Sequence, residues 1–124
     1  MTSFAEALPF VVAGQGIYYT ITGAWPLVSI RSFLKVTGPK TDIWLVKTVG
    51  GLVVALGIVF VVAALRGHLV TEILLLSCIC AFALAVVDTY YVLKGTISPV
   101  YITDAAAELL LLGFIMIAAL EGNS

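Results

Sequence analysis

The sequence predicts an all-α protein of a single domain, an integral membrane four-helix bundle whose helices run antiparallel, up-down-up-down. The first observation behind this prediction is composition, because 62% of the residues are hydrophobic and only 10% are charged. About a quarter of the residues are charged in a typical soluble domain. Six basic and seven acidic residues are too few to form a water-facing surface for a chain of 124 residues. The second observation is that the apolar residues are grouped into four long stretches separated by turn residues.

The four apolar stretches are each long enough to cross a bilayer once. A helix rises 1.5 Å per residue, so even the shortest stretch covers about 30 Å, the thickness of the hydrocarbon core. The predicted spans, within one transmembrane domain of residues 1–124, are approximately 8–30, 42–65, 71–93 and 99–120.

Turn chemistry marks the ends of these spans. In "LRGH" and "LKGT", a cation occupies the last helical turn and a glycine follows, which predicts helix ends at Gly67 and Gly95. Two starts fit the last helix: Ser98 as a cap before Pro99, or Thr103 as the cap one turn later. Pro26 is expected to kink or end the first helix.

The basic residues orient the predicted spans. The termini and the second loop would share one side of the membrane, and the first and third loops the other. Five of the six basic residues fall on the side of the first and third loops: Arg31, Lys35, Lys40, Lys47 and Lys94. Positive charge near span ends is retained in the cytoplasm, which predicts a cytoplasmic (inner) membrane protein with both termini outside, N-out/C-out. The segment after Ile30 is expected to extend the first helix into the headgroup layer.

Small and polar residues predict which helix faces meet, because close packing drives helix association in lipid. The third span has an interior seam at spacings of four and three: Ser77, Ala81, Leu84, Asp88 and Tyr91. The first and second spans offer small residues for contact: Gly16, Thr20 and Gly23 on one, and Gly51 and Ala55 beside Gly50 and Gly57 on the other.

Ionisable residues inside the spans are the candidate functional groups, since each costs at least about 2.5 kcal/mol at the membrane centre. Asp88 lies on the interior seam; the alternative is an aspartate near the interface that pairs with Lys94 or Lys47. Asp104 and Glu108 are four residues apart and share a helix face. If helix four begins at Pro99, Glu108 lies about 13 Å along it. Buried together, these acids would favour binding of a proton, as a proton-coupled site requires.

The first span carries a polar stripe that is expected to point into the bundle. Its residues, Gln15, Tyr18, Tyr19 and Thr22, could hydrogen-bond a ligand or only hold helices together. Lys47 is a possible partner for the acids or a snorkelling anchor.

Other site chemistry lacks its sequence pattern. The sequence has neither a glycine-rich phosphate loop nor a nucleophile elbow, and it lacks paired histidines and a C-x-x-C motif. We therefore expect that the protein is not an enzyme and that it binds no metal and no cofactor. His68 has no second ligand at metal spacing. Cys78 and Cys80 point to opposite sides of a helix. No basic array suggests nucleic acid.

The stretch "LVKTVGGLVVALGIVFVVAAL", a glycine-rich second helix after a basic first loop, resembles small four-helix bacterial membrane proteins of the DoxX-like kind. The resemblance implies the same layout, and some relatives are linked to quinone or thiosulfate redox complexes. Length and span number are also similar to small multidrug-resistance transporters. Those rely on a carboxylate within helix one, where this chain has only Glu6 before the span.

Three functional hypotheses follow. In the first, a binding or accessory protein holds a lipid, a quinone or another amphipathic molecule between Tyr18, Tyr19, Thr22, Asp88 and Glu108. In the second, a homodimer moves a proton or a cation using Asp88 or Glu108. In the third, the chain is a structural subunit of a larger membrane complex, with membrane lipids as its surroundings.

Overall fold

The structure of the protein is a computed structural model that describes residues 4–122. These residues form five α-helices and no strand, which confirms the all-α prediction. The helices are α1 (Phe4–Val28), α2 (Ile30–Thr37), α3 (Ile43–Leu65), α4 (Thr71–Leu93) and α5 (Tyr101–Gly122). In the described residues, α3, α4 and α5 are long and apolar enough to cross a membrane. Their bounds lie within two residues of the predicted second, third and fourth spans.

Helix α1 differs from the other long helices in its polarity. It has 25 residues, so it is long enough to span a bilayer. Its hydropathy is lower than that of α3, α4 and α5 because Gln15, Tyr18 and Tyr19 interrupt the apolar sequence near its middle. The predicted first span is therefore present as a helix, but it is not one of the three that qualify by composition.

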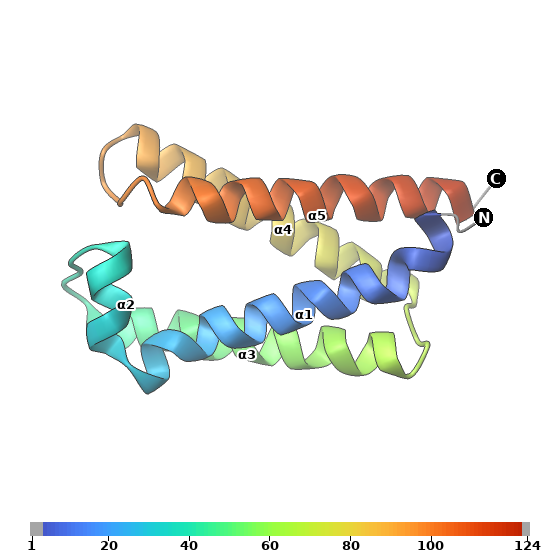
Figure 1. Ribbon diagram of the computed structural model, residues 1–124, viewed down its shortest axis with the longest axis horizontal. Helices are drawn as coiled ribbons and strands as arrows, with labels where there is room; N and C mark the ends of the chain where they lie inside the picture. The colour runs from blue at the N-terminus through green and yellow to red at the C-terminus, as the bar shows by residue number, and fades with distance from the viewer. Residues whose placement is uncertain (1–3, 123–124) are drawn as a thin grey trace.

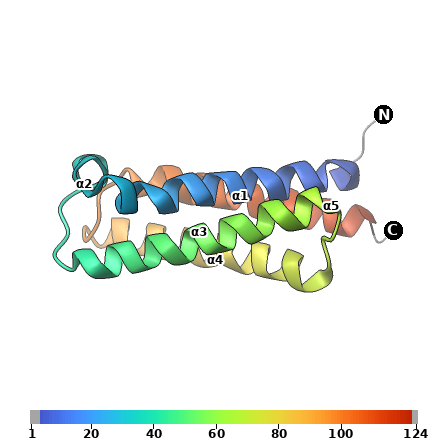
Figure 2. The ribbon, with the colours of Figure 1, turned by 90° about the horizontal axis from the view of Figure 1, so that it is seen from below.

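The four long helices lie lengthwise beside one another and form two closely packed pairs (Figures 1 and 2). Helix α1 packs along α3, α4 packs along α5, and α1 also contacts α5, whereas α3 and α4 barely touch. Consecutive long helices run in opposite directions (Figure 1). The α3–α4 loop therefore lies at the same end as the start of α1, and α2 lies at the opposite end with the α4–α5 loop.

Two glycine pairs bring α1 and α3 into backbone contact. A Cβ atom added to Gly16 would lie 2.6 Å from the carbonyl oxygen of Gly57, and one added to Gly23 would lie 2.6 Å from that of Gly50. The pairs are separated by seven residues, two helical turns, on both helices. The predicted contact face of the first helix is thus confirmed.

The expected contact through Gly51 and Ala55 is wrong. A Cβ on Gly51 would meet nothing within 4 Å, and Ala55 is exposed. Gly50 and Gly57, which the same prediction named beside them, are the glycines of α3 that face α1.

The glycine-marked helix ends are confirmed. Gly67 and Gly95 have φ angles of 70° and 75°, the left-handed conformation that follows a helix end and that glycine adopts without strain. Helix α5 starts at Tyr101, between the two predicted starts, and the Tyr101 N–H donates to the carbonyl oxygen of Ser98 at 3.1 Å. Pro26 lies inside α1, which ends two residues later.

Helix α2 is a separate element, not the expected continuation of the first helix. The helical conformation is interrupted at Ser29, whose side chain accepts a hydrogen bond from the Ser32 N–H. Helix α2 then turns away from the axis of α1 (Figure 1). Lys40 then holds the following loop against α5. Its Nζ donates to Thr37 Oγ1 at 2.8 Å and lies 5.2 Å from the ring centroid of Tyr101.

Candidate functional site

The inner face of α4 carries the first carboxyl group. Ser77, Ala81 and Asp88 are buried as predicted, and Asp88 is only 6% exposed. The predicted seam is wrong at two positions, because Ala85 is buried where Leu84 was expected, and Tyr91 is 41% exposed. A helix has 3.6 residues per turn, so a row at spacings of four, four and three stays on one face as far as Asp88.

Helix α5 supplies the other two carboxyl groups from one face. With the helix beginning at Tyr101, Asp104 lies in its first turn and Glu108 lies about 10 Å along it. Glu108 is 1% exposed and Asp104 is partly buried. Asp104 is close enough to interact electrostatically with both Asp88 and Glu108, so the three acids form one carboxyl cluster.

Two tyrosines of α1 donate hydrogen bonds to this cluster. The Tyr18 hydroxyl donates to Asp104 Oδ1, and the Tyr19 hydroxyl donates to Glu108 Oε1 at 2.7 Å. Adjacent residues on a helix point about 100° apart. Tyr18 therefore meets α5 near its start, while Tyr19 reaches the next turn of α5.

A buried glutamine extends the network toward the other end of the helices. Gln15 Nε2 donates to the Tyr19 hydroxyl oxygen at 3.2 Å and to the carbonyl oxygen of Ser77 at 3.1 Å, and the Ser77 hydroxyl donates to Gln15 Oε1. Ser77 and Asp88 are eleven residues apart on α4, about 16 Å along its axis. Buried polar side chains are therefore spread over roughly half the thickness of a bilayer's hydrocarbon core.

Two carboxylate oxygens of the cluster have no hydrogen-bond partner among the described residues. They are Asp88 Oδ2 and Glu108 Oε2, and both are fully buried. Within residues 4–122, no lysine or arginine forms an ion pair with any of the three acids. The other titratable groups close to Glu108 are Tyr18, Tyr19 and Cys80.

The predicted lysine partners lie elsewhere. Lys47 is exposed near the start of α3, and Lys94 places its Nζ 5.0 Å from the ring centroid of Tyr90. The alternative in which Asp88 pairs with Lys94 or Lys47 is therefore not the arrangement seen. No group of three or more histidine, cysteine, aspartate or glutamate residues in the described part of the chain could hold a metal ion.

Thr22 is the polar residue of the α1 stripe that does not join the network. Its hydroxyl donates at 2.8 Å to the carbonyl oxygen of Tyr18, one turn back in its own helix. Ser77 joins the network although only its role in the packing seam was predicted. The signal that could have identified it is its position eleven residues before Asp88, three helical turns away on the same face.

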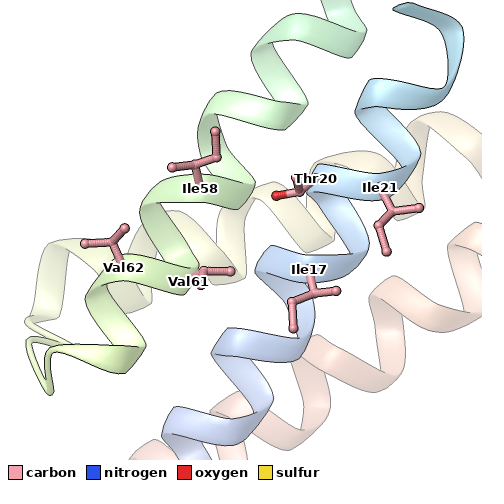
Figure 3. A pocket seen from close by; sticks show the side chains of 6 residues that line it. All are labelled: Ile17, Thr20, Ile21, Ile58, Val61 and Val62. Atoms are coloured by element: carbon pink, nitrogen blue, oxygen red, sulfur yellow. The ribbon is translucent and has the colours of Figure 1, made fainter. Parts of the chain in front are cut away.

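Direct contacts occupy the place where a ligand pocket was expected. The tyrosines donate hydrogen bonds to the acids themselves, and two apolar hollows on the surface of the bundle are lined by other residues. One of these hollows, between α1 and α3, is shown in Figure 3.

Comparison with protein-family models, with curated proteins and with solved structures finds no match to this chain. The resemblance to DoxX-like proteins thus remains a prediction from layout. Functional inference depends on the buried carboxyl cluster.

Proposed function

We propose that the protein is a proton-coupled transporter of the cytoplasmic membrane, with the carboxyl cluster as its proton-binding site. The observation that carries this proposal is the pair of buried, unpartnered oxygens of Asp88 and Glu108 in a cluster that has no cation. Removing two adjacent carboxylates from water without a counter-charge is too costly to be stable. A proton neutralises one acid and also supplies a hydrogen-bond donor for an unpartnered oxygen.

In this proposal α1 also crosses the membrane, as the first of four spans, and both termini of the chain are outside the cell. Three helices qualify as spans by composition, and α1 has similar length and lies along α3. The residues that make α1 less apolar, Gln15 and Tyr19, are buried against other helices and not turned outward to lipid. The basic residues of α2 and its following loop favour a cytoplasmic position for that end.

Burial differs between the two ends of the polar network, as a transporter requires. Tyr18 and Asp104, at the end near the α4–α5 loop, are only partly buried. Toward the other end, Val12, Phe60 and Ile115 have no exposed surface and belong to the apolar core. A proton could therefore enter from the α2 end while the other end is closed, and transport would alternate these two conditions. Because one chain is small for alternating access, we propose that two copies work together.

The lipid- or quinone-binding hypothesis is less well supported at this cluster. Such a molecule would have to displace the bonds from Tyr18 and Tyr19 to the acids, whereas a proton needs no cavity. An amphipathic substrate that enters from the partly buried side after a conformational change remains compatible with proton coupling.

The test is a rapid pH change applied to proteoliposomes on a solid-supported membrane, with recording of the transient current. The wild type is expected to give a transient current as protons enter the buried site from one side. Asp88→Asn with Glu108→Gln should abolish it, because amides keep the size of the side chains but take up no proton. Glu72→Gln, at an exposed glutamate in the first turn of α4, is the matched control and should keep the current.

Infrared spectra of the same variants make the result specific. The wild type should show an absorption band of a protonated carboxyl that the double variant loses. A wild type without a current, or a double variant with an unchanged current and band, would overturn the proposal.

A further inference from the structure

The outer surface of α3 has two apolar hollows separated by a ridge formed by Ile58 and Val62, which line both. The first hollow, about 260 Å³, lies between α1 and α3; Thr20 points toward α3, and Ile17 and Ile21 line the α1 side (Figure 3). The second, about 400 Å³, extends toward α4, and its lining includes Val59, Ala63, Val70 and Ile73. The second hollow lies where α3 and α4 barely touch.

A guanidinium group and an imidazole lie at one end of the second hollow. Arg66 and His68, both exposed in the α3–α4 loop, complete its lining. In the described part of the chain neither side chain forms an ion pair, and the remaining lysines and arginines lie at the opposite end, on or near α2 and in the α4–α5 loop. Arg66 lies one turn after Val62 and two turns after Ile58, which is about 6 and 12 Å along the axis of α3.

We propose that this surface binds one anionic phospholipid, with its phosphate at Arg66 and His68 and its two acyl chains on either side of the Ile58–Val62 ridge. A guanidinium group pairs well with phosphate, and an imidazole N–H adds a second donor. The hollows match hydrocarbon because no charged side chain lines them apart from those at this rim. Among the lining residues of the second hollow, Arg66 is the one lysine or arginine, which matches a headgroup with a single negative charge. This site is independent of the carboxyl cluster.

Phospholipid retention tests the proposal directly. The full chain is transferred from nanodiscs containing equal amounts of phosphatidylglycerol and phosphatidylcholine, and lipids that remain bound are identified by native mass spectrometry. We expect about fivefold enrichment of phosphatidylglycerol, the preference that one surface cation provides. Equal retention of the two lipids would contradict a selective anionic site.

Variants separate the headgroup from the acyl chains. Arg66→Gln with His68→Gln should bring the ratio of the two lipids to about one, whereas Arg31→Gln, at an exposed arginine of α2, should leave it unchanged. Val59→Trp fills the second hollow and should reduce retention of both lipids at an unchanged ratio. Leu52→Trp, two turns away on α3 and outside both hollows, is its control. An unchanged ratio in the double variant, an equal effect of Arg31→Gln, or full retention in Val59→Trp would overturn the proposal.

Discussion

Tyr19 connects the amide and carboxyl parts of the buried network through one hydroxyl group. Its oxygen accepts from Gln15 Nε2 and its proton is donated to Glu108 Oε1. Tyr19→Phe would leave two buried groups without this partner, so we expect a loss of about 1–3 kcal/mol in the free energy of unfolding. Thermal unfolding in a mild detergent measures the change. Tyr90→Phe, at a ring that is 51% exposed, is the control and should be neutral; equal stability of both variants would contradict a network held by the Tyr19 hydroxyl.

Most residues of the buried polar network were predicted from their type, and the packing of the helices determines which of the candidates join it. Acids and an amide inside apolar helices are costly in lipid, so their presence alone indicated Asp88, Glu108 and Gln15. Thr22 could not be separated from them by pattern, because a threonine in a helix can satisfy its hydroxyl at the carbonyl oxygen four residues earlier. Which acid each tyrosine donates to depends on the rotation of α1 against α5, and no local sequence signal specifies that rotation.

At the scale of the helical elements, α1 and α3 approach through glycines that permit no side chain. In Gly57→Ala, the new Cβ would lie 2.6 Å from the Gly16 carbonyl oxygen and 2.5 Å from Thr20 Oγ1, so the helices would have to separate. Overpacking of this kind costs about 1–3 kcal/mol, to be measured by thermal unfolding in detergent. Gly51→Ala, where a Cβ meets nothing, should instead be neutral or slightly stabilising because alanine favours helix. Destabilisation by both substitutions alike would rule out the specific glycine contact.

Helix limits were more predictable than helix contacts. The glycines at positions 67 and 95 act locally, since only the conformation of their own backbone is involved. By contrast, Gly50 and Gly51 are equivalent by composition, and the two helices select between them by their rotation about their axes. The break at Ser29 was not predicted, because Pro26 is the helix-breaking residue in this part of the sequence, whereas α1 continues past Pro26 to Val28.

For the whole molecule, the proposed four-span topology places Glu6 and His68 on one side of the membrane and Lys35 on the other. Cys78→Ala with Cys80→Ala gives a background without cysteine, into which Glu6→Cys, Lys35→Cys and His68→Cys are introduced one at a time. These three positions are exposed, at the start of α1, in α2 and in the α3–α4 loop.

An impermeant maleimide applied to intact cells reads the topology, because it labels only cysteines outside. With four spans and both termini of the chain outside, Glu6→Cys and His68→Cys should be labelled at once, and Lys35→Cys only after the membrane is permeabilised. If α1 lay outside the bilayer core and only α3, α4 and α5 crossed, position 6 would instead behave as position 35 does. This comparison bears on the proposed transporter, because both tyrosines and the glutamine of its polar network lie on α1. They can face a buried carboxyl cluster within the membrane only if that helix also crosses.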